Sequence, residues 1–144
     1  MKRIISLFFL LQILYSTSVR SQDISLYEQI NGRYDFTFVG NTMNSAENNP
    51  TNYLVTGTTS SADLNLNPND TLIRAYLYWA GSGDGDFEVE LNGIPIIAER
   101  TFSHFQEKTY GYFTYFSAFK DITSIVAAAG NGTYTLSDLD ISPF

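Results

Sequence analysis

The sequence predicts an all-β fold, an antiparallel β-sandwich or jelly roll with one short helix. Many short segments alternate apolar and polar residues, which is the period of a half-buried strand. Turn-forming residues separate these segments at modest intervals, and only one segment repeats apolar residues at helical spacing. An α/β sheet would need more helices. Because the chain has no cysteine, an aromatic-rich core has to stabilise the domain without disulfides.

The first 21 residues have the three parts of a secretory signal peptide. The basic pair Lys2 and Arg3 precedes an apolar run over residues 4–15, and a polar segment leads to a Val-Arg-Ser cleavage site that ends at Ser21. The run is shorter than the about 20 apolar residues that a membrane-spanning helix needs, which favours cleavage over a retained anchor. We expect residues 1–21 to be removed and residues 22–144 to form an exported, secreted or cell-surface β-sandwich domain.

The charge of the exported part excludes two classes of partner. The signal segment holds three of the eight basic residues and none of the fifteen acidic ones, so the remainder carries five basic and fifteen acidic side chains, a net charge of −10. Binding to nucleic acid or to an anionic lipid surface depends on Lys and Arg, and this field repels polyanions. We therefore expect no nucleic-acid partner and no membrane insertion after signal cleavage.

The N-terminal half predicts three strands and a turn. Residues 34–39 place Tyr34, Phe36 and Phe38 on one face, the pattern of a half-buried strand. Residues 53–58 and 62–66 are shorter candidates. The last of these stops at Asn-Pro-Asn-Asp, residues 67–70, where proline at the second position suits a type I turn.

A long strand and a hairpin follow the turn. Residues 71–80 place Ile73, Ala75, Leu77 and Trp79 on a fully apolar face, which predicts a central strand. The glycine-rich residues 81–86 predict a loop. The next hairpin joins residues 87–91 to a return strand over residues 94–100, because the Asn-Gly pair between them favours a type I′ turn.

The C-terminal third predicts two strands around the one helix. Residues 101–106 read as a loop or strand end, and residues 109–116 as an aromatic strand. Asp121 is placed to cap a helix with apolar residues at 122, 125, 126 and 129, which Gly130 ends. Residues 133–139 form the final predicted strand.

Five segments, taken in order, resemble a known module. They are residues 61–66, 73–81, 87–93, 115–126 and 130–136. This series resembles an N-terminal β-sandwich module of large secreted or surface proteins of Bacteroidota that end in gliding-motility-associated or type IX secretion sorting domains. The resemblance spans about residues 34–139 and implies an adhesive or scaffolding role without catalysis. It also implies further strands after Tyr134, so we expect the chain to be the N-terminal piece of a longer protein.

No arrangement of residues predicts an active site. His104 is the single histidine, no Gly-x-Ser-x-Gly elbow accompanies it, and one histidine without cysteine is a poor zinc ligand set. Glu88 and Glu90 project from the same face of a strand, the ordinary outward polar pattern of an antiparallel sheet. We expect no catalytic residue and no enzyme, while a hydrolase with its active site outside this chain stays a weaker alternative.

Two features carry binding hypotheses. Asp84 and Asp86 lie in a glycine-rich loop and offer calcium the oxygen ligands it prefers, although the EF-hand spacing is absent and a plain polar loop is favoured. Calcium is the one cofactor considered.

Four tyrosines, Tyr76, Tyr78, Tyr110 and Tyr112, either pack between the sheets, the favoured interpretation, or form a sugar-stacking platform. The sequence thus predicts a non-enzymatic adhesive or scaffolding module for a cell-surface protein or glycan. The alternative is a carbohydrate-binding module, with calcium as a possible aid.

Overall fold

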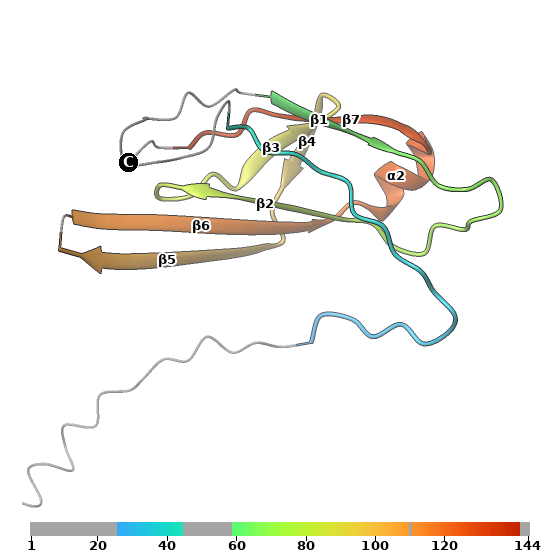
Figure 1. Cartoon of the computed structure of the whole chain (residues 1–144), viewed down its shortest axis with the longest axis horizontal. Helices are drawn as coiled ribbons and strands as arrows, with labels where there is room; N and C mark the ends of the chain where they lie inside the picture. The colour runs from blue at the N-terminus through green and yellow to red at the C-terminus, as the bar shows by residue number, and fades with distance from the viewer. Residues whose placement is uncertain (1–25, 45–58, 110, 142–144) are drawn as a thin grey trace, which may run out of the picture. The chain divides into compact units, whose positions relative to one another are not determined.

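The computed structural model describes residues 26–44, 59–109 and 111–141 (Figure 1). The chain divides into two units, with the boundary between Phe36 and Thr37, and each unit is described by itself. In the first unit, the described residues 26–36 form neither helix nor strand. Every strand and helix of the described residues belongs to the second unit.

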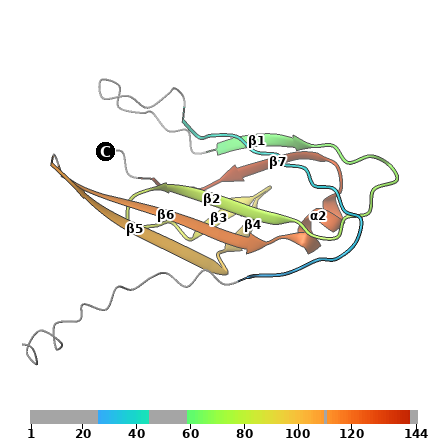
Figure 2. The same ribbon diagram turned by 60° about the horizontal axis from the view of Figure 1, so that its bottom comes forward.

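The second unit is an all-β sandwich of two antiparallel sheets, as predicted. Its elements are β1 (Thr59–Leu64), β2 (Tyr76–Ser82), β3 (Glu88–Leu91), β4 (Ile94–Ile97), β5 (Arg100–Lys108), β6 (Gly111–Asp121), α2 (Thr123–Ala129) and β7 (Gly132–Ser137). One sheet has the order β1-β7-β3-β4 and the other the order β2-β6-β5. Figure 1 shows the sheets as two layers, and Figure 2 shows α2 at one end of them.

The core lies between the sheets and is closed by the helix. Its buried side chains are Leu64, Trp79, Val89, Leu91, Ile96, Phe116, Ala118, Ile122, Val126 and Leu139. They come from both sheets, from α2 and from the segment after β7, so burial of apolar surface joins all these elements. The indole N–H of Trp79 donates to the backbone oxygen of Asp86 at 2.8 Å, which satisfies the polar atom of this large core residue.

The turn predictions that rest on local rules are confirmed. Asn92 and Gly93 have φ values of 53° and 75°, the two positive angles that a type I′ turn between β3 and β4 needs. The N–H of Asp70 donates to the backbone oxygen of Asn67 at 3.0 Å and closes the predicted turn.

The single predicted helix is present as α2. Its N-cap is Ile122 rather than the predicted Asp121, and Ile122 offers no side-chain cap. The carboxylate of Asp121, one residue earlier, accepts the N–H of Thr123 at 2.8 Å and so satisfies a donor that the first turn leaves unpaired. Gly130 ends the helix with a φ of 70°, a conformation that favours glycine. Within the described ranges, no helix is long and apolar enough to span a membrane.

The strand predicted over residues 34–39 is wrong. This segment has no strand pairing, and Phe36 and Phe38 are 79% and 87% exposed. The carboxylate of Asp35 accepts the N–H of Phe36 at 2.8 Å, which takes a donor that a strand ladder would use. Alternation of aromatic residues makes a strand possible, but only a neighbouring strand completes its hydrogen bonds.

Three other strand predictions need correction. β2 runs from Tyr76 to Ser82 rather than over residues 71–80, so Gly81 and Ser82 belong to the strand and not to the predicted loop. It is an edge strand rather than the predicted central one, because β6 lies at the centre of its sheet. Residues 101–106, predicted as a loop or strand end, lie within the nine-residue strand β5. The predicted return strand over residues 94–100 is divided: β4 ends at Ile97, and Arg100 begins β5 in the other sheet.

The remaining strand predictions agree with the structure within a few residues. Those over residues 62–66, 87–91 and 133–139 correspond to β1, β3 and β7, and the aromatic strand over residues 109–116 continues to Asp121 as β6. The candidate strand over residues 53–58 lies outside the described residues.

Gly81 occurs where β2 passes close to two apolar side chains. A Cβ atom at this position would collide with the side chain of Ile141 and would lie 2.9 Å from the ring of Phe116. The absent side chain therefore lets the segment after β7 pack against β2.

Candidate binding face

The two outer faces of the sandwich differ in chemistry. Residues paired across an antiparallel ladder project to the same side, so the register assigns each side chain to a face. We define the hydroxyl face as the outward side chains of β1, β3 and β7: Thr59, Ser61, Asp63, Glu88, Glu90, Thr133, Thr135 and Ser137. Ser61 and Thr135 share a hydrogen bond of 2.8 Å, and Thr133 donates to Asp63 at 2.6 Å. Over these three strands the exterior is polar, as is usual for a sandwich, whereas β4 adds Pro95 and the 64% exposed Ile97 to the same side.

The opposite outer face is rich in aromatic side chains. Phe116 and Ala118 of β6 point into the core, so Ser117 and Phe119 point outward. We define the aromatic face as the outward side chains of β2, β5 and β6: Tyr76, Tyr78, Ala80, Ser82, Arg100, Phe102, His104, Gln106, Phe113, Tyr115, Ser117, Phe119 and Asp121. Six of these thirteen residues are Phe or Tyr, so this face departs from the usual polar exterior.

The centre of the aromatic face is an aromatic cluster with two exposed rings. Phe119 lies between Tyr78 and Arg100 in the ladder and is only 4% exposed. The ring of Phe119 is 5.0 Å from that of Tyr78 and 5.3 Å from that of Tyr76. Tyr78 is 69% exposed and Phe102 is 45% exposed. Phe119 thus supports the cluster, while Tyr78 and Phe102 present ring surface to solvent.

The interpretation that the four tyrosines pack between the sheets is wrong for the three that lie among the described residues, Tyr76, Tyr78 and Tyr112. Tyr78 lies on the aromatic face, and Tyr112 is also 69% exposed. Tyr76 is half-buried on the aromatic face, and Tyr110 lies outside the described residues. The period of β2 and β6 does not distinguish inside from outside, because both faces of each strand carry large apolar residues.

Tyr112 belongs to a different surface at the tip of the β5–β6 hairpin. The ladder between β2 and β6 ends at Ser82 and Tyr115, so the hairpin continues beyond β2, as Figure 1 shows. There the ring of Tyr112 stacks on that of Phe105 at 5.4 Å, and Phe105 is 57% exposed. We call these two residues the tip pair. By register they project to the side opposite the aromatic face.

Charged groups border one end of the aromatic face. Hydrogen bonds from the side chain and the backbone of Thr123 lower the pKa of Asp121. The neighbouring Lys120 donates a hydrogen bond from Nζ to Oε1 of Glu99 at 3.0 Å. This bond is the largest cause that lowers the pKa of Glu99. Both carboxylates are therefore ionised at neutral pH and bind their neighbours within the fold.

His104 is exposed on the aromatic face, which confirms the prediction that it is a surface residue. In the part of the chain that the structure describes, no three His, Cys, Asp or Glu side chains gather as a metal site. The described residues thus offer no metal centre to which His104 could belong.

The two aspartates predicted to bind calcium have different surroundings. Asp84 is exposed, whereas Asp86 is half-buried and uses its carboxylate within the fold. One oxygen of Asp86 accepts the N–H of Glu88 at 3.3 Å, and the other accepts the N–H of Asp140 at 2.7 Å. Asp86 thus joins the loop before β3 to the segment after β7. Calcium binding by this pair stays a prediction.

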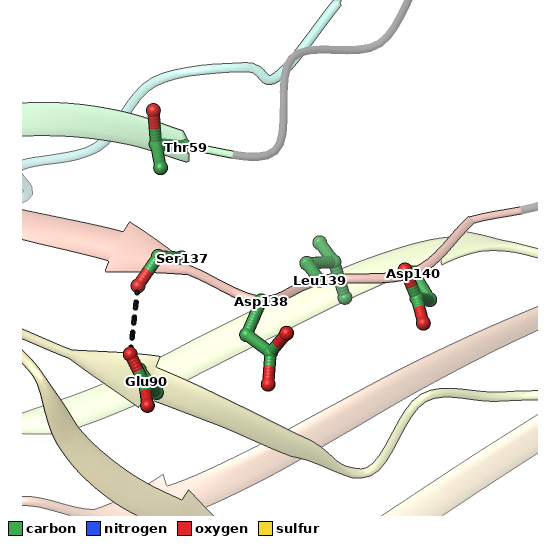
Figure 3. Close-up of a pocket in the computed structure, with 6 residues that line it drawn as sticks. All are labelled: Thr59, Glu90, Ser137, Asp138, Leu139 and Asp140. Atoms are coloured by element: carbon green, nitrogen blue, oxygen red, sulfur yellow. Dashed lines mark hydrogen bonds between the residues drawn. The ribbon is translucent and has the colours of Figure 1, made fainter.

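An open hollow of about 380 Å³ lies beside the end of β7 (Figure 3). Its lining residues are Thr59, Glu90, Ser137, Asp138, Leu139 and Asp140. The hydroxyl of Ser137 donates to Glu90 at 3.4 Å, and the two aspartates come from the segment after β7. Carboxylates are cation ligands, but no three of the described acidic side chains gather closely enough to hold a metal ion, those of this hollow included.

Sequence reasoning missed Phe102, Phe105 and Phe119. The signal was present in the aromatic residues of both strands, but the assignment of β5 as a loop hid it. When residues 100–108 are recognised as a strand, the register with β6 pairs Phe102 with Ser117, two residues before Phe119 on the same face.

Comparisons with known proteins give no match: no family model, no curated protein and no solved structure matches the chain.

Proposed function

We propose that this chain is an exported, non-enzymatic β-sandwich module that serves adhesion or scaffolding at the cell envelope, and that it contacts its partner through the aromatic face. The observation that carries the proposal is the exposure of Tyr78 and Phe102 on a sheet face where a sandwich ordinarily presents polar side chains. Exposed aromatic residues gathered on one surface are typical of binding sites.

One further observation in the sequence supports the export part of this function. The basic and apolar leader over residues 1–21 supports export. The resemblance to N-terminal modules of Bacteroidota surface proteins stays a prediction, since no family model matches.

Two measurements on the producing cells test the proposal. Mass spectrometry of the exported protein is expected to find a new N-terminus at Gln22, and protease added to intact cells is expected to digest the protein. Fluorescently labelled chain added back to these cells is expected to bind the envelope saturably. A protein that stays inside the cells with residues 1–21 attached, or that shows no saturable envelope binding, contradicts the proposal.

A further inference from the structure

The aromatic face lacks the side chains that a permanent protein partner would cover. None of its residues is Leu, Ile, Val or Met, whereas the core consists mainly of Leu, Ile and Val. An obligate protein–protein interface is more hydrophobic than this face and resembles a domain core cut in half. The aromatic face instead combines rings with hydroxyl, guanidinium and imidazole groups. This composition favours a ligand that stacks on rings and also forms hydrogen bonds.

The exposed rings are spaced along a path that a chain-like ligand can follow. Tyr78 and Phe102 lie on the two outer strands of the sheet, two residues apart along the strand direction. Strand spacing and rise place their Cα atoms about 12 Å apart. In the register, Ser117 and Phe119 of β6 lie between the two rings, and Phe119 is buried with only 4% of its surface exposed.

Hydrogen-bonding groups lie next to each ring. On β6, Phe119 is paired with Tyr78 on one side and with Arg100 on the other, so Arg100 lies across β6 from Tyr78. Ser117 is paired directly with Phe102. His104 lies one step further along β5. Sugar rings have apolar C–H faces and a rim of hydroxyl groups, so aromatic faces flanked by donors and acceptors match them.

The charge of the chain selects among glycans. Its net charge of −7, or −10 without the leader, repels polyanions at long range. The aromatic face itself carries one arginine, one histidine and one aspartate, which gives it no strong charge of either sign. We infer that the aromatic face binds an uncharged, linear polysaccharide, with Tyr78 and Phe102 as its two stacking platforms. This inference rests on the proposed function, because it names the ligand of the same face.

Affinity gel electrophoresis of the purified chain tests the inference. The probes are four uncharged polysaccharides, hydroxyethyl cellulose, laminarin, mannan and xylan, with alginate as the charged comparison. At least one uncharged polysaccharide is expected to retard the chain. Tyr78→Ala and Phe102→Ala are each expected to weaken that binding about tenfold, as the loss of one ring contact of about 1.4 kcal/mol implies.

The tip pair provides matched controls. Tyr112→Ala removes a tyrosine of equal exposure, 69%, and Phe105→Ala removes an exposed phenylalanine from the same hairpin. Both are expected to leave polysaccharide binding unchanged. Thermal unfolding of all four variants identifies any loss of folded protein, and a variant that unfolds is replaced by Tyr78→Ser or Phe102→Ser.

Each outcome decides for or against a polysaccharide ligand. No retardation by any uncharged probe, retardation by alginate alone, or equal weakening by face and tip variants overturns it. If the chain binds no polysaccharide but still binds intact envelopes through Tyr78 and Phe102, the glycan inference fails and the proposed function stands. If envelope binding is also absent, both fail.

Discussion

Replacement of Asp86 by alanine tests the link between the loop before β3 and the segment after β7. The substitution removes two acceptors, one for the N–H of Asp140 at 2.7 Å and one for the N–H of Glu88 at 3.3 Å. Hydrogen bonds to a charged group contribute about 1.5–3 kcal/mol. Because Asp86 is half-buried and the second contact is long, we expect a loss near the lower limit, about 1.5 kcal/mol.

Urea unfolding in the presence of a chelator measures this loss directly. A change of that size corresponds to a decrease in Tm of about 6 °C for a domain of this length. Asp84→Ala is the matched control, since Asp84 is exposed in the same loop, and it is expected to change stability by less than about 0.5 kcal/mol. Equal losses in the two variants, or no loss in Asp86→Ala, would refute the structural role given to Asp86.

The same pair of variants tests calcium binding. If Asp84 and Asp86 hold calcium, the ion raises the Tm of the unmodified chain and has no such effect on either variant. If Asp86 acts only through its two backbone contacts, calcium leaves all three proteins unchanged.

Three further predictions concern stability. Gly81→Ala places a methyl group against the two apolar side chains that pack there and is expected to destabilise the fold by about 1–3 kcal/mol, whereas Gly40→Ala, whose added methyl group would meet no atom within 4 Å, should leave the urea midpoint unchanged. The pKa values of Glu99 and Asp121 are lowered, so the stability that these carboxylates contribute to the fold is complete above their ordinary pKa values of 4.5 and 3.8 and is lost as pH falls below these. Urea midpoints should therefore decline as pH falls through that range. Constant midpoints would contradict this prediction. Burial raises the pKa of Tyr134 above its ordinary value of 10.0, so its contribution to folding stability is constant below pH 10 and is lost above it. Tyr134→Phe should therefore reduce the fall in the urea midpoint above pH 10.

Local chemistry explains which elements could be predicted from the sequence. The Asn92-Gly93 turn and the end of α2 at Gly130 depend on backbone angles that few other residues adopt, so a few residues suffice to identify them. The alternation of Val89 and Leu91 with charged neighbours likewise fixes which face of β3 is buried.

Pairing across the chain explains what could not be predicted. Residues 34–39 alternate as well as any strand here but form none, while β5 is a nine-residue strand because β6 offers it a partner along its whole length. Local pattern contains no information on which partner is present. The aromatic face was hidden for a related reason. The sequence pattern places Trp79 on the apolar face, which is buried, but only the sheet arrangement shows that the other face, with Tyr78, is left exposed.

Two asparagine side chains show how the sheet extends beyond its backbone ladder. The amide of Asn131 accepts the N–H of Leu66 at 2.7 Å and donates to the oxygen of Leu66 at 2.8 Å. The amide oxygen of Asn92 accepts the N–H of Thr135 at 2.7 Å. Each side chain replaces a missing strand residue, a role that no sequence pattern distinguishes from that of an ordinary turn asparagine.

The binding role of the aromatic face is tested most directly by the affinity of the labelled chain for intact cell envelopes. The measurement compares the double variant Tyr78→Ala/Phe102→Ala with the double variant Phe105→Ala/Tyr112→Ala, which removes the same two residue types from the tip pair. We predict that the first variant loses saturable binding while the second binds as the unmodified chain does. Equal binding by both variants, or loss confined to the tip variant, would contradict the assignment of the aromatic face as the binding surface.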